Sequence, residues 1–133
     1  MFRSTIEPAF EIYRLQPLDE YHANILATAI DNQLEWTFEY YRGGDRTRLF
    51  GTNNLKAFRK ELFKLCPKLR VMHDLADAAQ HRILTRRADP PRLVLVASRA
   101  YVRSGRGLWV TGFNEPFLLA ATAAVDFWRA WPD

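Results

Sequence analysis

The chain has 133 residues, of which 48% are hydrophobic and 14% aromatic, which is enough for one domain with a core and too few for two. A single cysteine excludes an intrachain disulfide framework, and the sequence shows neither a signal-peptide pattern nor an apolar run near the roughly 20 residues that cross a bilayer. The formal charge of +4 permits nucleic-acid contact without requiring it. We therefore expect one cytoplasmic domain over residues 1–133, with no membrane contact.

The N-terminal part of the chain predicts one long helix after a short lead-in. Residues 1–17 are ambiguous between a helical and an irregular segment, because Pro8 interrupts an apolar pattern. Asp19 is a suitable N-cap for a helix that runs to Tyr41 without glycine or proline. The acidic ridge of this helix is expected to face solvent and consists of Asp31, Glu35 and Glu39. Its core face is expected to carry Leu26, Ile30, Leu34, Thr37 and Tyr41, widened by Ile25, Ala29, Trp36 and Tyr40.

A basic loop and a second helix follow. The loop covers residues 42–51 and contains glycines beside three arginines, and Thr52 to Asn54 offer N-cap residues for the helix. The core residues expected in this helix are Leu55, Phe58, Leu62 and Leu65, and the outward ones are Lys56, Arg59, Lys60 and Lys64. If loop and helix form one patch, their cations can bind phosphate. The candidate binding residues are Arg42, Arg46, Arg48, Lys56, Arg59 and Lys60.

The segment Cys66–Arg87 predicts an amphipathic helix with Pro67 in its first turn. Its core stripe consists of Leu69, Met72, Ala76, Ala79 and Ile83, and its polar flank of His73, Asp74, Asp77 and His81. Asp77 can hydrogen-bond either imidazole, and a neighbouring carboxylate favours the charged ring, so His81 is a candidate proton carrier. The alternative is structural: a solvated helix face, or a buried Asp–His pair that fixes how the helix packs.

The remaining residues predict a β-hairpin and a last helix. Two prolines in Ala88–Arg92 end the central helix, and residues 92–112 are typical of two strands joined by a glycine-rich turn at 104–107. Asn114 can cap the last helix, whose stripe is Leu118, Ala121, Val125 and Trp128. Core aromatic residues are expected to include Trp36, Phe58 and Trp128. The predicted fold is mostly α, a bundle of about four helices with a small β-hairpin inserted before the C-terminal helix.

No metal site or cofactor is expected. His73 and His81 are separated by about 12 Å along a helix, at about 1.5 Å per residue, which is too far for one zinc ion bound at about 2 Å from each. His22 would have to complete such a site from another helix. The chain also contains no P-loop, dinucleotide-binding glycine motif or nucleophile elbow.

Two segments carry a resemblance to a known group of proteins. Ala23 to Trp36 (ANILATAIDNQLEW) and Cys66 to His81 (CPKLRVMHDLADAAQH) resemble small bacterial helical proteins without an established activity, although Gln80 stands where that group has a basic residue. The architecture is more distantly similar to HEPN domains, helical bundles that include RNA-cleaving toxins and nucleotide-binding proteins. HEPN nucleases carry Arg followed by His after a spacer of about four to six residues. Here Arg70 precedes His73 by two residues and His81 by ten, and Arg14 precedes His22 by seven.

These observations favour a non-enzymatic interaction or regulatory module, with a homodimer or another protein as partner. In that function Asp74, Asp77 and His81 fix packing or contact the partner. The alternative is a HEPN-like activity on RNA or nucleotides, with His81 and Asp77, and Asp74 beside them, as catalytic residues and the basic residues as the phosphate-binding patch. Plain RNA binding by the same patch is a further alternative.

Overall fold

The structure is a computed structural model that describes residues 5–44, 46–81, 83–84, 95–96, 101–105 and 107–131, with the backbone alone described at 81, 83–84, 95–96 and 104. Helices dominate these ranges, and a small antiparallel sheet precedes the last helix, so the predicted fold class is confirmed. The elements in chain order are α1 (Glu7–Leu15), α2 (Glu20–Tyr41), the 3-10 helix η2 (Arg46–Leu49), α3 (Leu55–Leu65), α4 (Pro67–His81), β1 (Ile83–Leu84), β2 (Leu95–Val96), β3 (Tyr101–Ser104), β4 (Gly107–Val110), β5 (Glu115–Pro116) and α5 (Phe117–Arg129).

The helix starts follow from their capping residues. Pro8 lies in the first turn of α1, where its missing N–H costs no hydrogen bond, so it begins a helix instead of interrupting one. Asp19 caps α2 as predicted, because its carboxylate accepts hydrogen bonds from the backbone N–H groups of residues 21 and 22 at 2.9 and 3.4 Å. Asn54 caps α3 in the same way and accepts from Ala57 N at 2.8 Å.

Three boundaries differ from the prediction. The central helix α4 ends at His81, and the predicted remainder to Arg87 is replaced at residues 83–84 by β1, which pairs antiparallel with β2. Residues 95–96, which fall within the region 92–112 predicted as a hairpin, form β2 and pair with β1. The hairpin itself consists of β3 and β4. Asn114 does not cap α5; its side chain accepts a hydrogen bond from Trp109 Nε1 at 3.2 Å, and Pro116 takes the cap position.

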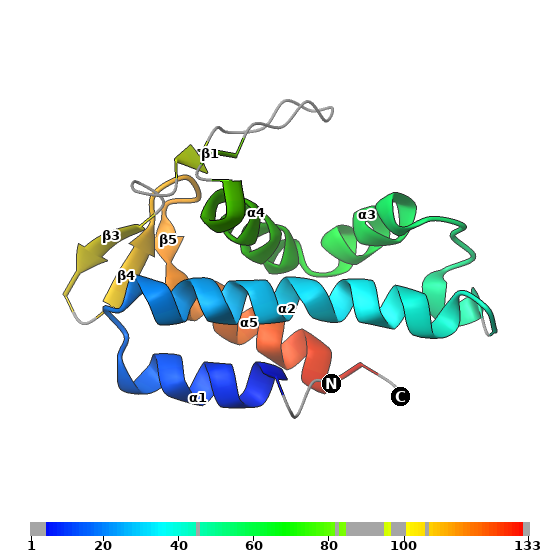
Figure 1. Ribbon diagram of the computed structural model, residues 1–133, viewed down its shortest axis with the longest axis horizontal. Coiled ribbons are helices and arrows are strands. Elements are labelled where there is room, and N and C mark those ends of the chain that lie inside the picture. The colour runs from blue at the N-terminus through cyan, green and yellow to red at the C-terminus, as the bar shows by residue number, and fades with distance from the viewer. Residues whose placement is uncertain are drawn as a thin grey trace.

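The core surrounds α2, which runs the length of the molecule (Figure 1). In this view α1 and α5 pack below and behind α2, α3 and α4 pack above it, and the small sheet lies at the end where α2 begins. The packing is tight at that end, where the rings of Tyr13 and Phe117 meet edge to face at 4.9 Å. The largest fully buried side chains include Tyr13, Leu26, Ile30, Leu34, Phe58, Met72 and Phe117. None of the described helices has the length and apolar character of a bilayer-spanning segment.

The apolar pattern predicted too wide a core face. Phe58 and Trp128 are buried as expected, whereas Trp36 is only partly buried. Four residues assigned to the core are exposed in the structure, namely Ile25, Tyr40, Leu65 and Leu118. Ala23 and Ala27 are fully buried on α2. The inner face of this helix therefore includes smaller side chains than predicted and is rotated around the helix axis relative to the predicted face.

Candidate functional site

A histidine held between two carboxylates joins α4 to α2. His73 donates its Nδ1 hydrogen to Oδ1 of Asp31 on α2, and these atoms lie 2.8 Å apart. The other ring nitrogen, Nε2, lies 3.7 Å from Oδ2 of Asp77, one turn further along α4. The side chains of His73 and Asp31 are 7% and 11% exposed, and that of Asp77 is 26% exposed. This Asp31–His73–Asp77 cluster is therefore largely inside the molecule.

One sequence prediction about these residues is wrong. Asp31 was expected on the solvent face of α2, but α4 covers it and supplies its hydrogen-bond donor. For the polar flank of α4 the sequence left a solvated face and a buried Asp–His pair open, and the structure buries both His73 and Asp74. A buried carboxylate or imidazole costs free energy unless it is paired, and the pairing across α2 and α4 provides that compensation. For His73, therefore, the structure agrees with the alternative of a buried Asp–His pair.

The cluster is suited to holding two helices in one register. Because a carboxylate cannot donate a hydrogen when ionised, the short contact places the hydrogen on Nδ1. The ring of Phe63 lies 5.8 Å from the imidazole and closes it off on the α3 side. A proton carrier has to reach its substrate, and both nitrogens of this ring already face carboxylates of the same chain.

The predicted catalytic residues are Asp74, Asp77 and His81. Asp77 lies beside His73, and Asp74 is buried and engaged within the chain. The side chain of His81 lies outside the described residues, so its contact with Asp77 and its role as a proton carrier stay predictions. Among the described residues no three His, Cys, Asp or Glu side chains are placed to hold one metal ion. Burial raises the pKa of the Cys66 thiol, so this cysteine is a poor nucleophile near neutral pH.

Several of the predicted phosphate-binding arginines are used within the chain. Arg42 pairs with Glu39 at 3.2 Å, and Arg59 bridges from α3 to Glu35 on α2 at 3.3 Å. The rest of the acidic ridge on α2 is therefore engaged by these arginines rather than simply solvated. Arg59 was predicted to point outward, but its side chain is only 20% exposed.

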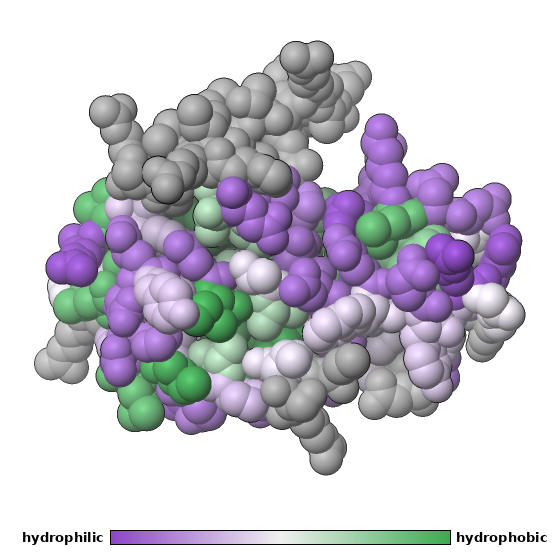
Figure 2. Space-filling view, viewed as in Figure 1, coloured by the Kyte–Doolittle hydropathy of each residue, from purple (hydrophilic) through white to green (hydrophobic). Residues whose placement is uncertain are grey.

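The other basic residues lie nearer to solvent. Arg46 donates to Asn53 Oδ1 at 2.7 Å, which brings the η2 loop to the start of α3, and the guanidinium of Arg48 lies over the Tyr41 ring. Lys56 and Lys60 are exposed on α3, and neither forms an ion pair with another described residue. The basic end of the molecule thus contains two available lysines and partly engaged arginines. Figure 2 shows it as the strongly hydrophilic region over α3 and the end of α2.

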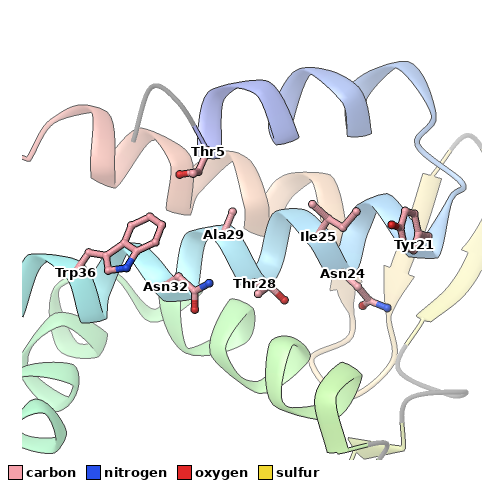
Figure 3. A pocket seen from close by; sticks show the side chains of 8 residues that line it. All are labelled: Thr5, Tyr21, Asn24, Ile25, Thr28, Ala29, Asn32 and Trp36. Atoms are coloured by element: carbon pink, nitrogen blue, oxygen red, sulfur yellow. The ribbon is translucent and has the colours of Figure 1, made fainter. Parts of the chain in front are cut away.

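An open groove of about 460 Å³ runs along the outer face of α2 (Figure 3). Ile25, Ala29 and Trp36 point toward α1, whereas the polar side chains on this face point toward α4. Thr28 and Asn32 form no side-chain hydrogen bond with any other described residue. The groove is lined by Thr5, Tyr21, Asn24, Ile25, Thr28, Ala29, Asn32 and Trp36.

Large apolar side chains are exposed at the end where α1 and α2 meet. Tyr21 and Ile25, which line the groove, are 68% and 41% exposed. Ile12 of α1 is 46% exposed, and the lining residue Thr5 lies two residues before α1 begins. Figure 2 shows hydrophobic side chains gathered over this half of the face. Leu15 and Leu18, which lie at the turn between the helices, are also exposed.

No protein-family model, curated protein or solved structure matches the chain. Only the geometry of its own residues therefore bears on its function.

The groove was not predicted from the sequence, although a signal for it exists. Apolar residues cover more than half the circumference of α2, which is wider than the roughly 100° stripe that one core contact needs. Ile25 and Trp36 are the surplus, and they line the groove. An apolar stripe wider than the core requires predicts a second contact surface.

Proposed function

We propose that this chain is a protein-interaction module and that the groove along α2 is its binding surface. The observation that carries the proposal is the exposure of Tyr21 and Ile25 in the lining of one open groove. Exposed apolar side chains that cluster beside a groove are typical of surfaces that bind another protein. Thr28 and Asn32 add hydrogen-bonding groups that a partner can use.

The buried polar cluster supports the same proposal. His73 is the histidine with the closest carboxylate contact among the described residues, and its partner Asp31 lies in the helix interface. The cluster therefore explains His73 and Asp77 of the α4 pattern through packing, which favours the outer face of α2 as the binding surface. Trp36 and Tyr21 at the two ends of the groove belong to the residue types that dominate binding energy at protein interfaces.

The experiment is a comparison of two glutamate variants as immobilised bait in extract from the source cells. Ile25→Glu places a charge in the groove, and Leu119→Glu places one on α5, outside the groove, at another exposed apolar residue. We expect the wild-type protein and the Leu119→Glu control to retain the same partner, and Ile25→Glu to lose it by at least tenfold. Equal retention by both variants would reject the groove as the binding surface.

A second candidate function is a HEPN-like activity on RNA or nucleotides. Its supporting observation is the basic end, where Lys56 and Lys60 are exposed and Arg46 ties the η2 loop to the start of α3. In this function the lysines bind phosphate, and His81 with Asp77 transfers the proton.

Salt dependence tests the RNA-binding part of the second candidate. The slope of log affinity against log salt should fall by about 1.4 in a Lys56→Gln, Lys60→Gln variant, since each contact to single-stranded RNA contributes about 0.7. Cleavage by the wild type and none by His81→Ala would support catalysis. An affinity for RNA that does not depend on salt would reject both phosphate binding by these lysines and the RNA-directed activity that relies on it.

A further inference from the structure

We propose that the partner of the groove is a second copy of this chain, bound with the two α2 helices antiparallel across a twofold axis between Thr28 and Ala29. The inference rests on the proposed function and names its partner. The groove, the charge distribution along α2 and the residues at the centre of the groove each bear on it.

The lining of the groove is symmetric about its own midpoint. Measured along α2, Tyr21 and Trp36 are equally far from the point between Thr28 and Ala29, at about 11 Å on either side. Ile25 precedes this point by as many residues as Asn32 follows it. When two such helices meet antiparallel, the aromatic end of each lies at the level of the aromatic end of the other. An isologous interface requires this self-complementary spacing.

Small side chains occupy the centre. Thr28 and Ala29 would allow the two helix axes to approach to about 8 Å, the short end of the usual range of helix packing. A twofold axis at this point sets Thr28 against the Thr28 of the second copy. The hydroxyl of Thr28 makes no side-chain hydrogen bond with the other described residues, so the symmetric contact would give it a partner.

Charge favours the antiparallel orientation of two copies. Near the start of α2 the carboxylates of Asp19 and Glu20 have no lysine or arginine partner among the described residues, whereas Glu11 is paired with Arg14 and Glu7 with Arg129. Beyond the end of α2 the cations that form no ion pair with a described residue are Arg46, Lys56 and Lys60, whereas Arg42, Arg59 and Lys64 are paired with Glu39, Glu35 and Glu61. An antiparallel pair places the acidic end of each copy near the basic end of the other, whereas a parallel pair places like charges together.

The border of the groove is electrically compensated. Asp31 is paired with His73, and Glu35 with Arg59, so a second copy buries no lone carboxylate from the α4 side. Glu20 is exposed, but it lies about 100° around the helix from Tyr21 and away from the groove. A neutral border suits a second neutral border better than a strongly charged partner.

The area of contact sets the strength of the dimer. The groove extends over about 22 Å of one helix, which alone is well short of the roughly 800 Å² per partner of a standard interface. The exposed apolar area within the groove comes mainly from Tyr21 and Ile25. We therefore expect a dimer with a dissociation constant on the order of micromolar.

Sedimentation equilibrium across the micromolar range gives the first test. The wild type and the Leu119→Glu control should show the same monomer–dimer equilibrium, and Ala29→Arg should shift the dissociation constant upward by at least tenfold. Circular dichroism of Ala29→Arg confirms that the variant is folded. A wild-type chain that stays monomeric over the whole range overturns the dimer. In that case loss of captured protein by Ile25→Glu would still support the groove as a binding surface.

Disulfide cross-linking in a Cys66→Ser background tests the orientation. Thr28→Cys should form a covalent dimer by itself. Ile25→Cys should not, because the two copies of residue 25 lie about 10 Å apart along the axis, but it should cross-link when mixed with Asn32→Cys. Efficient self-linking of Ile25→Cys would indicate a parallel pair and overturn the proposal.

Discussion

Truncation of His73 to alanine removes the only donor that the structure places on the buried carboxylate of Asp31 within the described residues. The imidazole and the carboxylate are 7% and 11% exposed, so water cannot readily replace the lost contact. Breaking a buried pair by removing one partner costs about 3–5 kcal/mol. Because Asp31 keeps a little exposure and can regain some hydration, we expect a loss near the lower end, about 3 kcal/mol. This is a substantial share of the roughly 5–15 kcal/mol that a domain has.

Urea unfolding followed by circular dichroism measures this loss, and a double-mutant cycle assigns it. In an Asp31→Ala background the same His73→Ala change should cost about 2 kcal/mol less, since the carboxylate is already gone. His22 is the matched control, because its Nε2 lies 3.6 Å from Asp19 in a partly exposed pair, and His22→Ala should cost about 0.5 kcal/mol or less. An equal cost of His73→Ala in both backgrounds would refute the pairing as the source of stability.

Three further predictions concern other parts of the fold. Burial raises the pKa of Tyr101, so at high pH the folded state keeps this phenol proton while the unfolded state loses it. Stability should therefore fall as the pH rises above about 10. Urea midpoints measured against pH should fall less steeply in Tyr101→Phe. The raised pKa of Cys66 predicts slower alkylation by iodoacetamide in the native protein than in urea, and equal rates would contradict it. Asp19→Ala removes the N-cap of α2 and should lower the free energy of unfolding in urea by about 1 kcal/mol. A variant as stable as the wild type would contradict a stabilising role of this cap.

Local sequence signals predicted the helices well. Asp19 and the stretch Thr52–Asn54 were identifiable as caps because each precedes an apolar pattern of helical period, and in the structure Asp19 and Asn54 are the capping residues. The hairpin was also predicted, from its glycine-rich turn. In the structure Gly105 has the positive φ, 60°, that the turn between β3 and β4 uses. These features depend on a few neighbouring residues.

Features that depend on distant residues were not predicted. The contact of Asp31 with His73 joins residues 42 positions apart, and helical periodicity gives no information on which turn of α2 meets which turn of α4. The same limit applies to the end of α4, since Ile83 continues the helical stripe but pairs with Val96 in the structure. A local pattern cannot weigh a helical turn against a strand partner supplied by a later segment.

The candidate binding surface was missed for a related reason. Ile25 and Trp36 were assigned to the core because both are apolar and lie next to the core stripe. Their exposure depends on where α1 and α4 pack, and these two helices leave the face between them open. The basic residues show the opposite case, in which Arg59 was assigned to solvent and is held by Glu35.

The decisive measurement compares partner binding by the Ile25→Glu variant with the stability of the same variant. Because the stabilising cluster surrounds His73 and the binding face surrounds Ile25, we expect Ile25→Glu to keep its urea midpoint close to that of the wild type. The variant should lose the partner protein that the wild type and Leu119→Glu retain. Retention of that partner by a folded Ile25→Glu variant would contradict the assignment of this face as the functional surface.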